Sequence, residues 1–95
     1  MKFSELMARA EAKDVAGVAE ALTVVWGLDP AAAQASAAQW VPGFSGFMAQ
    51  GALMGVHKDA LDGEEERARA TLTGHYKLSE ADAATAIATI RAREG

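Results

Sequence analysis

The feature that most constrains this chain is a pattern of residues that returns after a shift of fifty positions. Leu22-Thr23, Trp26, Leu28 and Asp29 fall on Leu72-Thr73, Tyr76, Leu78 and Ser79. The pattern predicts a helix that ends on an aromatic residue, a tight connection with a buried leucine, and a capped return helix. We interpret it as a candidate internal repeat over 14–40 and 64–90, and the alternative is convergence on the same capping chemistry.

The boundaries of the expected helices follow from local capping rules. Gly27 suits the left-handed end of a helix, Asp29 suits the cap of the next helix, and Pro30 suits its first turn. At the N-terminus, Ser4 is a candidate cap for the first helix, and Asp14 with Gly17 leaves open whether this helix breaks in two. The other expected helices are Pro30 to about Trp40, about Ser45 to Leu61, Glu64 to Tyr76, and one that begins after Ser79.

Composition adds the fold class. Ninety-five residues suit one domain, and period-two alternation typical of strands does not persist anywhere. We therefore expect a single all-helical domain over 1–95, all-α, as a compact five- or six-helix bundle in which two helix hairpins repeat. Alanine supplies about a quarter of the chain; it favours helices but brings little apolar area to bury. A core built this way favours self-association as a source of further burial.

Charge and cysteine content exclude several classes of protein. The formal net charge of −4 argues against nucleic-acid binding, which needs a basic face. The absence of cysteine excludes disulfides and thiolate chemistry. The first residues carry charges every few positions and lack an apolar core, so we expect no signal peptide and a cytoplasmic location.

The middle of the chain, from Pro30 to Val56, has no charged residue, and Gly51 and Gly55 stand one helical turn apart. Three interpretations compete. The segment inserts into a membrane, which its proline, glycines and glutamines disfavour; or it is a central helix buried on all sides; or its glycine face lets another copy or a partner helix approach closely. In the third interpretation the contact residues are Phe44, Phe47, Met48, Gly51, Leu53, Met54 and Gly55.

No group of residues points to catalysis. His57 and His75 lack the spacing of a zinc site, and the acids around residue 60 do not follow the calcium-loop pattern. Gly43-Phe44-Ser45-Gly46 lacks the lysine and the preceding strand of a phosphate loop. We expect no metal, no cofactor and no enzyme activity.

These observations favour a small non-enzymatic interaction or assembly module of adaptor, accessory or inhibitor type. It would act by self-association as a homo-oligomer, or by docking on a protein partner. An alternative is a bundle that binds a small apolar ligand among Trp26, Trp40, Phe47 and Tyr76. A further alternative is a membrane-surface protein.

Overall fold

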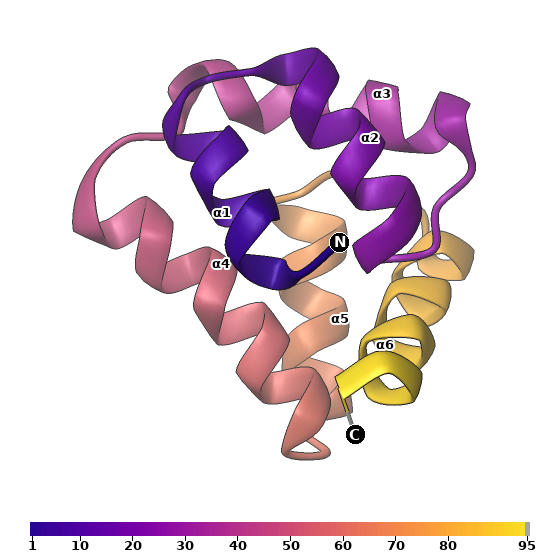
Figure 1. The fold of residues 1–95 in the computed structure, drawn as a ribbon. Helices are drawn as coiled ribbons and strands as arrows, with labels where there is room; N and C mark the ends of the chain where they lie inside the picture. Colours follow the sequence, from indigo (N-terminus) through magenta and orange to yellow (C-terminus); the bar gives the residue numbers. More distant parts are fainter. Residues whose placement is uncertain (95) are drawn as a thin grey trace.

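The computed structural model describes residues 1–94, and over that range the chain forms α-helices joined by short turns and no strand (Figure 1). The expected all-α bundle is confirmed, with six α-helices in this range. They are α1 (Phe3–Glu11), α2 (Val15–Val25), α3 (Pro30–Trp40), α4 (Gly46–Leu61), α5 (Glu65–Gly74) and α6 (Glu80–Glu94), with a single 3₁₀ turn, η1 (Val41–Gly43), after α3. The bundle measures 29 × 28 × 24 Å.

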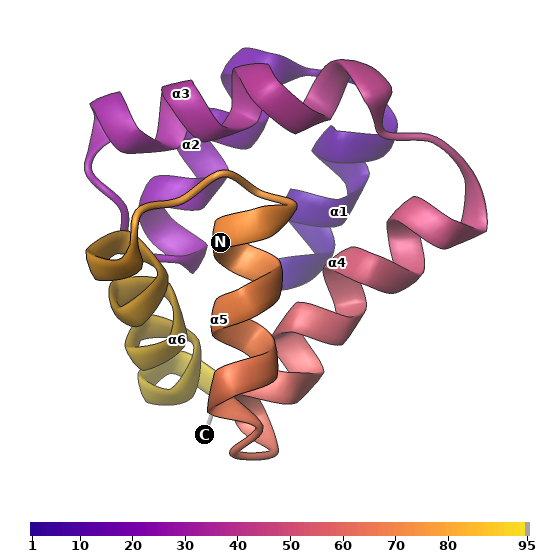
Figure 2. The same cartoon turned by 180° about the vertical axis from the view of Figure 1, so that it is seen from behind.

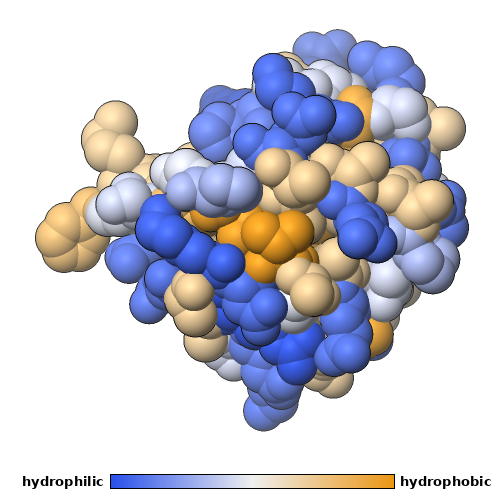
Figure 3. Space-filling model, turned by 90° about the horizontal axis from the view of Figure 1, so that it is seen from above, coloured by the Kyte–Doolittle hydropathy of each residue, from blue (hydrophilic) through white to orange (hydrophobic). Residues whose placement is uncertain are grey.

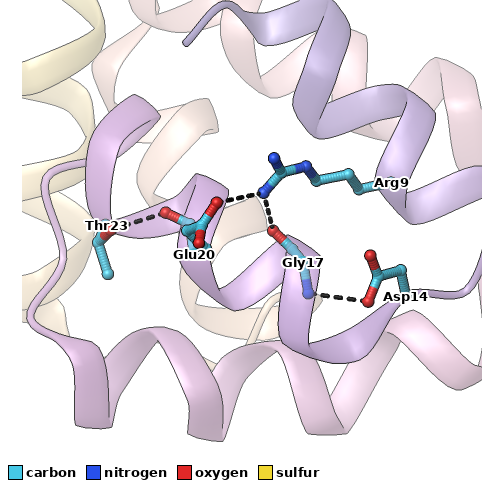
Figure 4. Close-up of polar contacts among 5 residues, drawn as sticks. All are labelled: Arg9, Asp14, Gly17, Glu20 and Thr23. Carbon is cyan, nitrogen blue, oxygen red and sulfur yellow. Dashed lines mark hydrogen bonds and ion pairs between the residues drawn. The ribbon is translucent and has the colours of Figure 1, made fainter.

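The first helix breaks near Asp14, a point that the sequence left open. The Oδ1 atom of Asp14 accepts a hydrogen bond of 2.9 Å from the backbone N–H of Gly17 and so caps α2 (Figure 4). A Cβ atom on Gly17 would collide with this carboxylate. Arg9 of α1 donates to the backbone oxygen of Gly17 at 2.8 Å and to Glu20 at 2.9 Å, which ties the two helices together (Figure 4).

The expected cap at Ser4 is wrong. Helix α1 begins at Phe3, and its cap position is Lys2, two residues before the expected cap; the Lys2 side chain makes no capping hydrogen bond. Ser4 therefore lies inside the first turn. Helix ends fray, so capping residues alone fix the start of a helix only to within one or two positions.

The other boundaries agree closely with the sequence. Asp29 Oδ1 accepts from the backbone N–H of Ala32 at 2.9 Å, and α3 spans Pro30–Trp40 as expected. Ser79 Oγ accepts from the backbone N–H of Asp82 at 3.1 Å at the start of α6. Helix α5 is shorter than predicted, since it ends at Gly74 and leaves Tyr76 in the following turn.

Three aromatic side chains meet in the core. The ring of Tyr76 lies edge-on to Trp26, with centroids 5.5 Å apart, and to Trp40, with centroids 5.0 Å apart. The buried Ser36 hydroxyl donates to the backbone oxygen of Tyr76 at 2.7 Å and accepts from Trp40 Nε1 at 3.1 Å. This centre joins α2 and α3 to the turn between α5 and α6.

The two halves of the chain show matching local structure at the shift of fifty residues. The backbone N–H of Leu28 donates to the oxygen of Leu22 at 3.3 Å, and that of Leu78 donates to the oxygen of Leu72 at 3.0 Å. In Figures 1 and 2, α1 to α3 form one side of the bundle and α4 to α6 the other. The origin of this correspondence in a duplicated segment stays a prediction.

Candidate interaction surface

Helix α4 lies at an edge of the bundle and packs on α5 and α6 (Figure 2). Its buried residues are Leu53, Val56 and Ala60. They lie three and four positions apart, so they form one stripe of the helix. Helix α1 also reaches α4, where the ring of Phe3 lies 4.5 Å from that of His57. The side of α4 opposite the buried stripe is exposed at Phe47, Met48 and Met54.

That opposite side is apolar at its N-terminal end. Phe47 is 91% exposed, Met48 89% and Met54 56%. Together with Leu61, which lies further along the same helix, they are the exposed large hydrophobic residues of the described chain. Figure 3 shows apolar atoms standing clear of the body at the left, on the side where α4 begins. Burial normally removes such side chains from water, so a cluster of them on one helix is a candidate for an interaction site.

Two glycines lie between these side chains. Gly51 is exposed and Gly55 is half-buried, and a Cβ atom added at either position would meet no atom within 4 Å. The helix surface therefore has no projecting side chain at these two positions, and nothing inside the molecule requires glycine there. We call the set Phe47, Met48, Gly51, Met54 and Gly55 the α4 face.

Two residues that the sequence placed in the contact seam do not belong to this face. Leu53 is fully buried against the bundle, and Phe44 is buried before α4 begins. Their inclusion was wrong as a prediction of surface contacts. The physical reason is that Gln50 is the one polar side chain of α4 from Gly46 to Val56, so no polar side marks which of the apolar residues point outward.

Contacts from the first half of the chain hold the start of α4 in place. Lys13 Nζ donates to the backbone oxygens of Pro42 at 3.1 Å and Phe44 at 2.8 Å. The ring of Phe44 packs edge-on against Trp40 with centroids 5.8 Å apart. Phe44 thus anchors the turn that presents Phe47 and Met48 to solvent.

The C-terminal half of α4 is held by polar contacts instead. Lys58 pairs with Asp62 at 2.6 Å, and this hydrogen bond raises the pKa of Lys58. Asp59 lies 3.7 Å from Arg67, and the backbone oxygen of Ala60 accepts from Arg91 Nε at 2.8 Å. The C-terminal end of α4 is therefore polar and bonded to α5 and α6, whereas its N-terminal end carries exposed apolar side chains.

The four residues expected to line a ligand pocket do not form one site. Trp26 and Tyr76 are fully buried, Trp40 is nearly so, and the three pack against one another, whereas Phe47 stands in solvent on α4. A surface recess of about 340 Å³ borders Trp40, Phe44, His75 and Lys77, and another of about 330 Å³ lies between α2 and α3. Neither is lined by Trp26 or Tyr76, because these rings fill the core.

Within residues 1–94 no group of three or more histidine, aspartate or glutamate side chains is arranged to hold a metal ion. Over the same range, none of the helices has both the length and the apolar character needed to cross a bilayer. No protein-family model, curated protein or solved structure matches this chain. The α4 face is the site that the residues themselves define.

Proposed function

We propose that this protein is a small non-enzymatic interaction module, which docks through the α4 face on a protein surface. The observation that carries the proposal is the exposure of Phe47, Met48 and Met54 on one helix. Flexible methionine side chains adapt to varied partner surfaces, and a phenylalanine supplies a large apolar contact. Smooth backbone at Gly51 lets a partner approach the helix closely.

The rest of the helix supports this role. Interfaces are apolar at their centre and polar at their rim, and α4 has this order along its length, from Phe47 to the ion pair of Lys58 and Asp62. The charged end offers polar contacts at the border of the face. The buried stripe with Leu53 gives the face a rigid support, so little order has to be gained on binding.

Histidine is the residue best suited to catalysis near neutral pH. Both histidines of this chain pack against aromatic rings. The His57 ring lies 4.5 Å from the ring of Phe3, and the His75 ring lies 4.6 Å from that of Tyr76. This arrangement favours binding over catalysis as the role of the protein.

A photoreactive phenylalanine analogue at position 47 tests the proposal in the cell that makes the protein. The matched control carries the same analogue at Ala35, which is exposed on α3 within the same uncharged segment. We expect protein adducts at position 47, and a strong loss of them when Met48 and Met54 are both changed to serine. Equal adduct yields at positions 47 and 35, or yields that ignore the serine changes, would contradict the proposal.

A further inference from the structure

We infer that the occupant of the α4 face is a second copy of the same chain, paired antiparallel about a two-fold axis at Gly51. This inference rests on the proposed function and names its partner. It comes from the order of large and small residues along the face, from the charge distribution, and from the area that the pairing would bury.

The order of residues on α4 is self-complementary. An antiparallel pair centred on Gly51 places Phe47 of one copy opposite Gly55 of the other, and Met48 opposite Met54. Each large side chain then meets a glycine or a flexible methionine, and the two Gly51 residues face each other at the axis. Open space at both glycines leaves room for the opposing side chains. In a two-fold interface every such contact occurs twice, as this arrangement requires.

The distribution of charge favours the same surface. Each chain has a formal net charge of −4, so two copies repel each other over most of their surfaces. Residues 30–56 are free of charge, and the axis at Gly51 lies within this segment. The nearest charged residue along α4 is Lys58, which falls opposite the start of the other helix and already pairs with Asp62. No like-charged residues of the two α4 helices oppose each other.

The area that the two copies would bury sets the expected affinity of the dimer. Two phenylalanines and four methionines would bury on the order of 1,000 Å², with an aromatic side chain contributing about 150–250 Å². This lies at the lower end of specific interfaces, below the range of obligate dimers. We therefore expect a reversible homodimer whose population rises with concentration.

Light scattering over a range of about 10 µM to 1 mM tests the association. We expect the average mass to rise from one chain toward two. Gly51→Leu should weaken the dimer by at least about tenfold in Kd, because leucine at the axis separates the helices. The monomer tolerates this change, since the position is open and leucine favours helix more than glycine does. An unchanged melting temperature in dilute solution checks that point, and Ala35→Leu is the matched control.

Single cysteines test the antiparallel register, because the chain has none of its own. Gly51→Cys should form a disulfide-linked dimer readily. Met48→Cys mixed with Met54→Cys should cross-link faster than either variant alone, whereas a parallel pair would link each position to itself. A strict monomer at all concentrations, or faster self-linking at 48 and 54, overturns the inference. Adducts at position 47 to a different protein would leave the proposed function in place, so the two failures are distinguishable.

Discussion

Trp26 and Tyr76 pack edge to face at an interplanar angle of 80°; they follow the ends of α2 and α5 and stand fifty positions apart in the chain. The Tyr76 hydroxyl is buried and has no hydrogen-bond partner in the part of the chain that the structure describes. A buried hydroxyl without a partner destabilises the folded state, while the ring itself contributes packing.

Tyr76→Phe should therefore leave the free energy of unfolding unchanged or raise it by about 1 kcal/mol. Tyr76→Ala should lower it by about 3–5 kcal/mol, because it leaves a cavity beside both tryptophans. Denaturant titration measures both variants. A clear loss of stability in Tyr76→Phe would show that the hydroxyl has a bonding partner after all.

The same burial predicts how stability depends on pH. Desolvation raises the pKa of Tyr76 above its ordinary value of 10.0. Above pH 10 the unfolded chain loses this proton while the folded chain keeps it, so stability falls as the pH rises. The slope contributed by this group is at most about 1.4 kcal/mol per pH unit. The fall of the unfolding free energy with pH should be shallower in Tyr76→Phe. The lysines ionise in both proteins, so the difference between the two slopes isolates the contribution of Tyr76. Because this is the only tyrosine, absorbance at alkaline pH reports its ionisation directly.

Ser36 provides a second prediction about the core. Its hydroxyl joins Tyr76 and Trp40 by two buried hydrogen bonds. Ser36→Ala removes both and leaves a backbone oxygen and an indole N–H unpaired, which should cost about 2–3 kcal/mol. Ser45→Ala is the control, since Ser45 is exposed and makes no capping hydrogen bond. Equal stability of the two variants would contradict the role of Ser36.

The turns after α2 and α5 predict that substitutions at two corresponding positions, Gly27 and Lys77, change the stability in opposite directions. Gly27 has a φ of +69°, and a Cβ atom there would collide with Thr89. Lys77, fifty positions later, has a φ of 60° despite its side chain. Gly27→Ala should therefore destabilise the protein by more than about 1 kcal/mol, whereas Lys77→Gly should stabilise it by up to about 1 kcal/mol. Thermal unfolding of both variants checks the signs of these changes. Adding Thr89→Ala to Gly27→Ala should restore only the stability lost to the collision with Thr89, and not the part lost to backbone strain.

The sequence predicted what depends on local chemistry. Asp29 with Pro30 fixed a helix start, and Ser79 fixed another, because a cap is made by residues three positions apart. The left-handed conformation of Lys77 was missed, although its alignment with Gly27 was a usable signal. The bonding role of Ser36 was also missed, since its partner Tyr76 lies forty residues away.

The candidate site was predicted only in part, for a different reason. The sequence located the uncharged helix but assigned Phe44 and Leu53 to its surface. In α4 the inward side is set by packing against α5 and α6, which no local pattern on an apolar helix reveals. Phe47, Met48 and Met54 lie on the outward side, as the contact hypothesis requires.

This split between inner and outer residues of α4 makes a direct prediction about stability. Leu53 is fully buried, so Leu53→Ala should lower the free energy of unfolding by about 2–5 kcal/mol. Phe47 and Met48 make little contact with the bundle, so Phe47→Ser with Met48→Ser should change the stability of the monomer by less than about 0.5 kcal/mol. Unfolding should be measured in dilute solution, where association adds nothing to stability. A large loss in the double serine variant would mean that these side chains pack on their own chain, and the α4 face would then not be free for a partner.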